Sequence, residues 1–213
     1  MRSRRRRLQG SRLYALIDKD MFKKPAAALA KKLAESGVDI IQLRDKSSSK
    51  TGILKEACSI SQALKNTRAI FIVNDHPGIA KLSGSDGLHI GQSDIALKEA
   101  RGILGKNRLI GVSCSNLKEA LEAQRSGADY IAIGPLFKTP TKAGCDPIGL
   151  KGIKDLSQKI KVPVFAIGNI NRDNLEKVTS CGIKRIALCR AILKSKDIPR
   201  AVEYFSAKLK KAK

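Results

Sequence analysis

Eight short apolar runs alternate with segments of helical periodicity through almost the whole chain. Such alternation is typical of repeated βα units, whose strands form a parallel sheet. Eight units in 213 residues predict an α/β fold, a single (β/α)8 TIM barrel with its active site at the C-terminal ends of the strands. An open doubly wound sheet is the alternative. The runs are Leu13 to Ile17, Val38 to Leu43, Ala69 to Val73, Gly87 to Ile90, Leu109 to Val112, Tyr130 to Ile133, Pro163 to Ile167 and Arg185 to Leu188.

The division into domains follows from where the alternation begins. Residues 1–11 form an arginine-rich leader, which we expect to be disordered, and residues 12–213 are expected to form one catalytic barrel domain. One phrase recurs where predicted helices lead into strands, as Glu35-Ser-Gly-Val-Asp39 and Arg125-Ser-Gly-Ala-Asp129. Its glycine suits a helix C-terminus.

The formal net charge is +23, from 42 Lys and Arg against 19 Asp and Glu. Part of the excess lies in the two tails and the rest is spread among helices, so no specific nucleic-acid partner is predicted. The charge favours small phosphorylated substrates, with a polyanion- or RNA-binding role on an inactive barrel as an alternative. No apolar run approaches the roughly 20 residues of a membrane span. We therefore expect a cytoplasmic protein without a membrane partner, and a homo-oligomer is compatible with the sequence.

The cysteines and histidines limit the chemistry. Five widely spaced cysteines, without a CxxC pair, predict neither a disulfide framework nor a structural zinc site, and Cys145 is interpreted as a small packing residue. The chain has two histidines. His89 lies within a predicted strand and is expected to be a packed, hydrogen-bonded residue, so a general-base imidazole is not favoured.

Basic residues follow the second predicted strand, in Gln42-Leu-Arg-Asp-Lys46. Strand alternation places Gln42, Arg44 and Lys46 on a common side, where an amide, a guanidinium and an ammonium can converge on one oxyanion. The alternative is a solvated strand end.

Carboxylates follow the third and fourth predicted strands. Val73-Asn-Asp75 ends one strand, and Asp94 lies shortly after the next. Because carboxylates at a barrel mouth suit Mg²⁺ together with substrate phosphates, the sequence predicts a magnesium site. Helix N-caps are the alternative for Asn74, Asp75 and Asp94, since Pro77 begins a possible helical turn.

The remaining strand ends favour anionic ligands. Ser113, after the fifth strand, either faces the mouth or caps a helix. The stretch from Gly134 to Gly144 follows the sixth strand and contains two threonines and two lysines. Gly168, after the seventh strand, permits a close backbone approach, and the loops after strands seven and eight are frequent phosphate sites in barrels. Two anion sites suit a reaction in which pyrophosphate leaves while a phosphorylated second substrate attacks.

These motifs resemble those of the thiamine phosphate synthase family, in the same order over about residues 12–205. The family joins a pyrimidine diphosphate to a thiazole phosphate and releases pyrophosphate. The motifs are Gln42-Leu-Arg-Asp-Lys46, Val73-Asn-Asp75, Gly87-Leu-His-Ile-Gly-Gln92 with Asp94, Gly111-Val-Ser113, Gly134-Pro-Leu-Phe-Lys-Thr-Pro-Thr-Lys-Ala-Gly144 and Ala166-Ile-Gly168.

The resemblance implies a role for each matching residue. Asp75 and Asp94 would bind Mg²⁺. The pyrimidine diphosphate would be held by Gln42, Arg44, Lys46, Asn74, Ser113 and Lys142. The thiazole phosphate would contact Thr139, Pro140, Thr141, Gly168, Cys189 and Arg190. Tyr14 either lines the pyrimidine pocket or is a core aromatic.

The implied chemistry is a dissociative substitution without a protein nucleophile. The pyrimidine methylene loses pyrophosphate, and the thiazole nitrogen attacks the resulting cation. The catalytic residues would stabilise the charge on the leaving group. They are Arg44, Lys46, Ser113 and Lys142.

The chain departs from the family at two positions. Asn169 stands where a second glycine is usual, and Arg190 where a small hydroxyl residue is usual. We expect a cradle of backbone N–H groups to tolerate both. The nearest alternative is a thiazole tautomerase-like relative, which would lack the metal carboxylates and carry a proton-transfer residue near the fifth strand.

Overall fold

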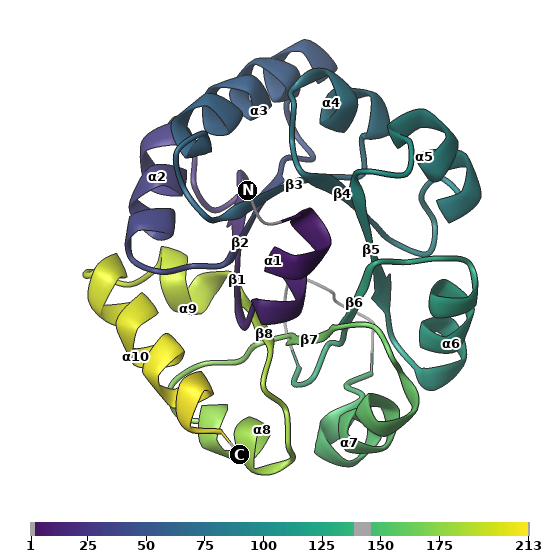
Figure 1. The fold of residues 1–213 in the computed structure, drawn as a ribbon. Coiled ribbons are helices and arrows are strands. Elements are labelled where there is room, and N and C mark those ends of the chain that lie inside the picture. Colours follow the sequence, from purple (N-terminus) through teal and green to yellow (C-terminus); the bar gives the residue numbers. More distant parts are fainter. Residues whose placement is uncertain (1–2, 139–145, 213) are drawn as a thin grey trace.

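The computed structural model describes residues 3–138 and 146–212. Its strands form one closed parallel barrel in chain order, so the predicted TIM barrel is confirmed and the open sheet is wrong (Figure 1). The strands are β1 (Leu13–Asp18), β2 (Ile40–Arg44), β3 (Ile70–Asn74), β4 (Gly87–Ile90), β5 (Leu109–Cys114), β6 (Tyr130–Ile133), β7 (Val164–Ile167) and β8 (Ile186–Leu188). The barrel closes where Leu13 of β1 pairs with Ile186 of β8.

Helices that follow the strands surround the barrel in the order expected for βα units, whereas α1 precedes β1 and lies across one end of the barrel (Figure 1). None of the described helices is long and apolar enough to span a membrane. The helices are α1 (Arg4–Gly10), α2 (Ala27–Glu35), α3 (Lys50–Leu64), α4 (Pro77–Leu82), α5 (Leu97–Leu104), α6 (Leu117–Arg125), α7 (Gly149–Lys159), α8 (Leu175–Ser180), α9 (Arg190–Leu193) and α10 (Ile198–Lys211).

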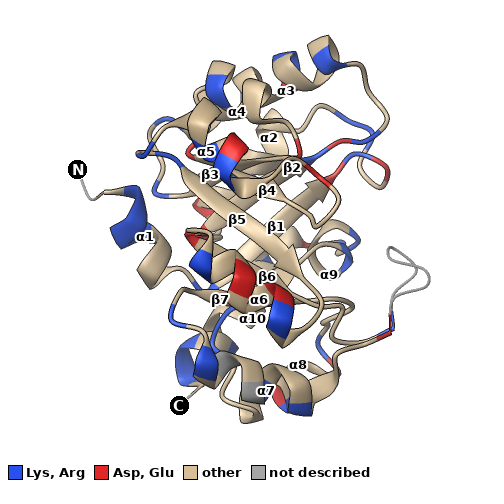
Figure 2. Cartoon of the chain, turned by 90° about the vertical axis from the view of Figure 1, so that its right-hand side faces the viewer, with Lys and Arg blue, Asp and Glu red and all other residues tan. Residues whose placement is uncertain are grey.

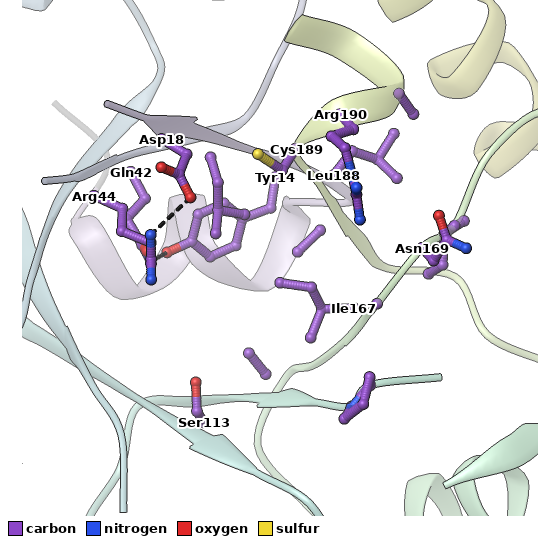
Figure 3. A pocket seen from close by; sticks show the side chains of 18 of the residues that line it. Tyr14, Asp18, Gln42, Arg44, Ser113, Ile167, Asn169, Leu188, Cys189 and Arg190 are labelled. Atoms are coloured by element: carbon purple, nitrogen blue, oxygen red, sulfur yellow. Dashed lines mark hydrogen bonds and ion pairs between the residues drawn. The ribbon is translucent and has the colours of Figure 1, made fainter. Parts of the chain in front are cut away.

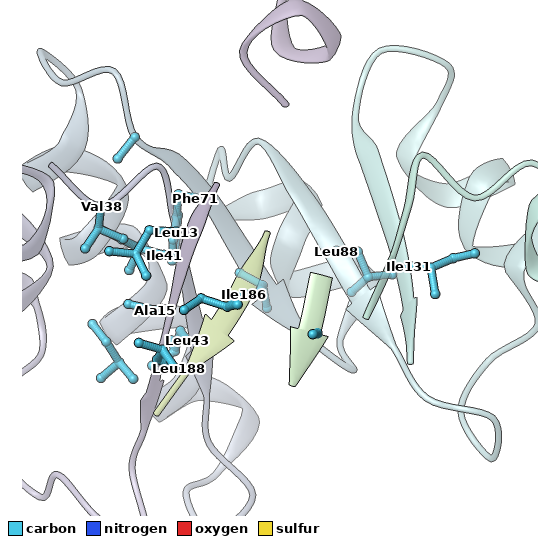
Figure 4. Packing of buried hydrophobic residues seen from close by; sticks show 14 of the residues in the cluster. Leu13, Ala15, Val38, Ile41, Leu43, Phe71, Leu88, Ile131, Ile186 and Leu188 are labelled. Carbon is cyan, nitrogen blue, oxygen red and sulfur yellow. The ribbon is translucent and has the colours of Figure 1, made fainter. Parts of the chain in front are cut away.

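Strand alternation divides the apolar residues into two layers. On β2, Ile41 and Leu43 pack in the cluster between strands and helices, whereas Ile40 packs in the cluster inside the barrel (Figure 4). Inside the barrel, Tyr14, Tyr130 and Phe165 are almost fully buried and their rings are 5.5–6.0 Å apart. Because each strand is buried on both faces, the sequence shows continuous apolar runs.

The aspartates of the recurrent phrase connect neighbouring strands at the N-terminal end of the barrel. Asp39 accepts hydrogen bonds from the backbone N–H groups of Arg12 and Leu13, at 2.8 and 2.9 Å. Asp129 accepts one from Ile110 at 2.9 Å. In both cases the residue before one strand satisfies a donor at the start of the previous strand. The phrase therefore sets the alignment of β1 with β2 and of β5 with β6.

The basic leader differs from the expectation of disorder, because residues 4–10 form α1. Leu8 is 1% exposed and packs inside the barrel. Arg4 and Arg7 bind Asp86 at 2.7 and 2.9 Å, and Arg5 binds Asp129 at 2.9 Å. In side view, α1 lies at the opposite end of the barrel from α9 (Figure 2). The expectation of disorder is wrong for these residues, since carboxylates distant in sequence hold the arginines.

Candidate functional site

A cavity of about 460 Å³ opens at the C-terminal ends of the strands (Figure 3). Its lining includes seven of the residues predicted from the sequence: Gln42, Arg44, Asn74, Ser113, Gly168, Cys189 and Arg190. Lys46, Asp75 and Asp94 are not part of the lining. Thr139, Pro140, Thr141 and Lys142, together with Cys145, lie outside the described residues. The barrel therefore brings together residues from β2, β3, β5, β7 and β8.

The β2 side of the cavity contains an ion pair that crosses to β1. Arg44 donates to Asp18 Oδ2 at 2.7 Å, and its guanidinium is also 3.7 Å from Asp20 (Figure 3). Parallel pairing of β1 and β2 sets Asp18 directly beside Arg44. Because the Asp18 side chain is only 4% exposed, this pair holds the guanidinium at the cavity wall. Asp18 was not predicted, although a carboxylate at the end of the first apolar run was a visible signal.

Lys46 pairs with a different carboxylate from Arg44 and does not line the cavity, so the predicted convergence of Gln42, Arg44 and Lys46 is only partial. The Lys46 ammonium is 3.3 Å from Asp75 Oδ2, at the end of β3. Gln42 is 2% exposed and donates to the Tyr14 hydroxyl at 2.5 Å inside the barrel. Exposure therefore increases from Gln42, which is buried in the barrel, to Arg44, whose side chain is 22% exposed, and to Lys46, whose side chain is 52% exposed.

The backbone holds Asp75 in an unusual conformation. Its φ is +61°, a left-handed value that Asp and Asn adopt more readily than most residues. The Asp75 N–H donates to the His89 carbonyl at 2.9 Å, and the N–H of His76 donates back to the Asn74 carbonyl at 2.8 Å. The turn directs Asp75 toward Asp94. Helix capping is excluded as the role of Asn74 and Asp75, because His76 occupies the N-cap of α4 and makes no side-chain cap bond.

Asp75 and Asp94 form a pair of like charges beside Lys46. Burial raises the pKa of Asp75, and the hydrogen bond and negative charge of Asp94 raise it further. Burial also opposes ionisation of Asp94, but the Gly91 N–H, which donates to Asp94 at 2.6 Å, helps to hold its pKa below the ordinary value. Asp94 does not cap α5, whose N-cap is Ala96.

This carboxylate pair fits a magnesium ion. The described residues contain no cluster of three or more His, Cys, Asp or Glu side chains that could hold a metal. Two carboxylates are nevertheless sufficient for Mg²⁺, which takes one or two of them and completes its shell with water and phosphate oxygens. A cation between Asp75 and Asp94 would relieve the repulsion that raises the pKa of Asp75. Water and the oxygens of a phosphorylated substrate would complete this donor set.

Ser113 faces the barrel interior and does not cap α6, because Asn116 accepts the N–H of Glu119 at 3.0 Å. The Ser113 hydroxyl is 2.9 Å from His89 Nε2, and His89 Nδ1 is 3.1 Å from the Tyr130 hydroxyl. His89 is 5% exposed, so the prediction of a packed, hydrogen-bonded histidine is confirmed. Its contact with a predicted site residue was missed, because sequence spacing does not show which side chains meet across a barrel.

Gly168 connects the loops that follow β6 and β7. Its φ is +110°, and a Cβ there would lie 2.5 Å from Pro135 Cα and 2.6 Å from the Leu136 nitrogen. The Leu136 N–H donates to Ile167 at 2.8 Å, and that of Phe137 to Gly168 at 3.2 Å. Glycine is thus required by the close approach of the two loops. Its carbonyl oxygen accepts the hydrogen bond from Phe137.

The two departures from the family pattern lie on the same side of the cavity. Asn169 has φ +52°, a left-handed conformation that Asn tolerates best after glycine, and its side chain donates to the Lys138 carbonyl at 3.0 Å. Arg190 begins α9 and lines the cavity next to Cys189 (Figure 3). Burial raises the pKa of Cys189 to about 11, and its sulfur is 3.7 Å from that of Met21. The wall therefore holds a guanidinium beside a protonated thiol.

Comparisons with known proteins agree on one family. The family model for thiamine monophosphate synthase matches residues 13–192. The chain is 37% identical to a thiamine-phosphate synthase of Shouchella clausii over 203 residues, covering 94% of this chain and 97% of that protein. It is 38% identical to one from Halalkalibacterium halodurans, covering 92% and 93%. The structure resembles thiamine phosphate pyrophosphorylase from Pyrococcus furiosus, with a TM-score of 0.87, 31% identity and 98% of each chain covered.

Proposed function

The chain belongs to the thiamine monophosphate synthase family and is a transferase that forms thiamine phosphate, and we propose that it does so in the cavity at the barrel mouth. The substrates are 4-amino-2-methyl-5-hydroxymethylpyrimidine diphosphate and 4-methyl-5-(2-hydroxyethyl)thiazole phosphate, and pyrophosphate is released. The observation that carries the proposal is the position of Arg44 and Ser113 on one side of this cavity, with Gly168 and Arg190 on the other.

The pyrimidine diphosphate occupies the side formed by β1 to β5. Gln42 and Tyr14 contact the pyrimidine ring, and the side chains of Arg44, Lys46, Asn74 and Ser113 hold its diphosphate, joined by Lys142. Support comes from the depth of the groups: Gln42 is buried in the barrel, whereas Lys46 is at its rim, with its side chain 52% exposed. An elongated ligand with an aromatic head and a charged tail matches this gradient.

Mg²⁺ is proposed to bind Asp75 and Asp94 together with the diphosphate. When bound, it neutralises charge on the leaving pyrophosphate. The Lys46 ammonium, 3.3 Å from Asp75, would lie beside this ion and contribute a second positive charge toward the diphosphate. Arg44 differs, because its ion pair with Asp18 orients the guanidinium at the cavity wall.

The thiazole phosphate occupies the side formed by β7, β8 and the loop after β6. Its phosphate meets backbone groups near Gly168 and Cys189 and the Arg190 guanidinium. Thr139, Pro140 and Thr141 are proposed as further contacts. Two features support this subsite: hydrogen bonds tie the two loops together, and Arg190 adds a positive charge to the cavity wall. The carboxylate of Asp18 lies near Cys189, where its negative charge is paired with the guanidinium of Arg44.

The reaction is proposed to be dissociative. The bond between the pyrimidine methylene carbon and the diphosphate oxygen breaks first, and its electron pair leaves with pyrophosphate. The amino-substituted ring spreads the positive charge, and the thiazole nitrogen then donates its lone pair to the carbon. Arg44, Lys46, Ser113 and Lys142 stabilise the leaving group, while the cavity holds the substrates in reacting positions. No protein side chain forms a covalent bond.

Two alternatives are weaker. A thiazole tautomerase-like role does not explain why Lys46, Asp75 and Asp94 are all present. A polyanion- or RNA-binding role rests on the arginine leader, but Arg4, Arg5 and Arg7 are engaged by aspartates of the barrel. We therefore propose small phosphorylated substrates as the ligands. Because phosphorylated metabolites do not cross membranes unaided, the cytoplasm is the proposed location.

The direct test mixes the purified protein with both substrates and Mg²⁺ and follows thiamine phosphate and pyrophosphate. We expect the two products in equal amounts, and neither after EDTA treatment. Omission of the thiazole phosphate is the matched control. Absence of product over a range of pH and divalent cations would contradict the proposed function.

A further inference from the structure

A continuous hydrogen-bonded chain crosses the barrel interior beneath the cavity. It runs from Gln42 through the hydroxyls of Tyr14 and Tyr130 to His89 and Ser113, with distances of 2.5, 3.0, 3.1 and 2.9 Å. Gln42, Tyr14, His89 and Ser113 line the cavity, whereas Tyr130 is 0% exposed and is not part of the lining. The chain therefore connects the β2 side of the cavity floor with the β5 side.

The amide at one end determines the direction of the chain. The Gln42 N–H donates to the Tyr14 oxygen, so the Tyr14 hydroxyl proton is available to Tyr130. In this direction Tyr130 donates to His89 Nδ1, and an imidazole with its single proton on Nε2 donates to Ser113. In this arrangement every buried hydroxyl proton has an acceptor, and the Ser113 proton remains for a ligand in the cavity.

The opposite direction leaves a buried donor without an acceptor. If Ser113 donated to His89, then Nδ1 would donate to Tyr130 and Tyr130 to Tyr14. The Tyr14 oxygen would receive two hydrogen bonds, and its own proton would lack an acceptor among its described partners, Gln42 and Tyr130. A buried unsatisfied hydroxyl is costly, so the first direction is favoured.

We propose that His89 is a positioning residue that holds the Ser113 hydroxyl with its proton directed into the cavity. The inference rests on the proposed function, in which the leaving diphosphate contacts Ser113. As negative charge develops on the departing oxygen, a hydroxyl that is already oriented stabilises it without reorganisation. The same chain begins at Gln42, beside the proposed pyrimidine ring. His89 therefore acts through Ser113 and does not exchange a proton with the substrate.

The histidine tautomer can be measured without any enzyme activity. The protein has two histidines, His76 and His89, so ¹⁵N-histidine labelling gives two imidazoles to assign in long-range ¹H–¹⁵N spectra. His89→Asn identifies the His89 signals. We expect a protonated Nε2 and an unprotonated Nδ1 whose shift changes in Tyr130→Phe. An Nδ1-protonated ring would overturn the proposal.

Two substitutions of His89 separate its two contacts. His89→Asn retains an amide near the position of Nδ1 but loses the donor to Ser113. His89→Gln places an amide N–H near the position of Nε2. We expect His89→Asn to lower kcat about tenfold while changing each KM less than about twofold, and His89→Gln to restore most of the loss. Equal effects of both variants would overturn the proposal.

A double-mutant cycle tests whether His89 acts through Ser113. His89→Asn combined with Ser113→Ala should be no slower than Ser113→Ala alone, because the histidine has no hydroxyl left to orient. Phe165→Leu is the control for packing, since this ring contacts Tyr14 and Tyr130 without a hydrogen bond. It should lower Tm and leave kcat nearly unchanged. Independent, multiplying effects of His89→Asn and Ser113→Ala would contradict the positioning role.

The measurements also distinguish failure of the inference from failure of the proposed function. A wild-type protein that forms no thiamine phosphate contradicts the function, while the tautomer measurement still decides the direction of the chain. If the wild-type protein turns over but the effects of His89→Asn and Ser113→Ala on kcat multiply, only the inference about His89 is contradicted.

Discussion

The Lys46 ammonium lies 3.3 Å from the carboxylate of Asp75, where the chain leaves β2 and β3. The contact joins a proposed diphosphate ligand to a proposed metal ligand. Asp75 also lies beside Asp94, and two ionised carboxylates against one ammonium give the cluster a net negative charge before any cation is bound. A net negative charge would attract a divalent cation to Asp75 and Asp94, which the following substitutions test.

Asp75→Asn should abolish most of the Mg²⁺-dependent turnover. We expect kcat to fall about 100-fold, since one of two protein ligands is lost. Asn adopts the left-handed conformation at φ +61° readily, so Tm should change little. The measurement is kcat against Mg²⁺ concentration.

Asp20→Asn is the matched control, because Asp20 is another carboxylate at the mouth. Its side chain is 52% exposed, and its contact with Arg44, at 3.7 Å, is longer than the 2.7 Å contact of Asp18. Its kcat should stay within about twofold of wild type. An Asp75→Asn variant with wild-type magnesium dependence would remove Asp75 from the metal site.

Arg44→Gln should lower both stability and activity. The substitution leaves Asp18, whose side chain is 4% exposed, without its guanidinium partner. We expect a loss of about 2 kcal/mol in the free energy of unfolding, less than for a fully buried pair because the Arg44 side chain is 22% exposed. Asp18→Asn in the same chain should restore stability but not turnover. If the double variant regained activity, Arg44 would have only a structural role.

Gly168→Ala should be more destabilising than the same change at Gly37. Both glycines have positive φ, +110° and +102°, so both variants strain the backbone. Only at Gly168 would the new Cβ meet the backbone of Pro135 and Leu136, whereas nothing lies within 4 Å at Gly37. We expect about 1 kcal/mol for Gly37→Ala and about 3 kcal/mol for Gly168→Ala, measured by urea unfolding.

The same glycine variant should raise the KM for the thiazole phosphate, because the two loops around this subsite would separate. The KM for the pyrimidine diphosphate should change less. Equal stability losses at the two glycines would show that the close loop contact does not constrain the site.

Leu8→Ala should destabilise the barrel without affecting the chemistry. Leu8 is 1% exposed inside the N-terminal end of the barrel, far along the fold from the cavity. A loss of about 3 kcal/mol is expected from the cavity that the truncation creates. Arg6→Ala, at an exposed position of the same helix, should have little effect. An unchanged Tm for Leu8→Ala would mean that α1 is a detachable leader after all.

Cys189 should react slowly with alkylating reagents. Burial raises the pKa of its thiol to about 11, so only a very small fraction is thiolate at pH 7, and the fraction rises as the pH approaches 11. Mass spectrometry after iodoacetamide treatment at pH 7 should find the exposed Cys58 modified well before Cys189. Faster modification of Cys189 would indicate an activated thiol in the cavity.

The barrel could be predicted because each of its strands is recognisable from a short stretch of consecutive residues. Strands buried on both faces appear as apolar runs, and the predicted run Ala69 to Val73 differs from β3 by one residue at each end. The leader could not be predicted, since an arginine-rich segment has the composition of a disordered tail. Its helix is stabilised by Asp86 and Asp129, which are distant in sequence.

The sequence could predict which side chains gather at the barrel mouth only in part, and it could not predict their contacts. Residues after consecutive parallel strands must meet at one end of a barrel, which is why Gln42, Arg44 and Ser113 were found. Their partners depend on how neighbouring strands align. The pairing of Asp18 with Arg44 and the approach of His89 to Ser113 follow from this alignment, which no sequence spacing shows.

The most direct test of the account is a crystal structure of the protein with thiamine phosphate, pyrophosphate and Mg²⁺. We predict pyrophosphate between Arg44, Lys46 and Ser113, with Mg²⁺ on Asp75 and Asp94, and the thiamine phosphate group near Gly168 and Arg190. Ligands bound outside the cavity, or a magnesium ion that neither aspartate contacts, would contradict the account.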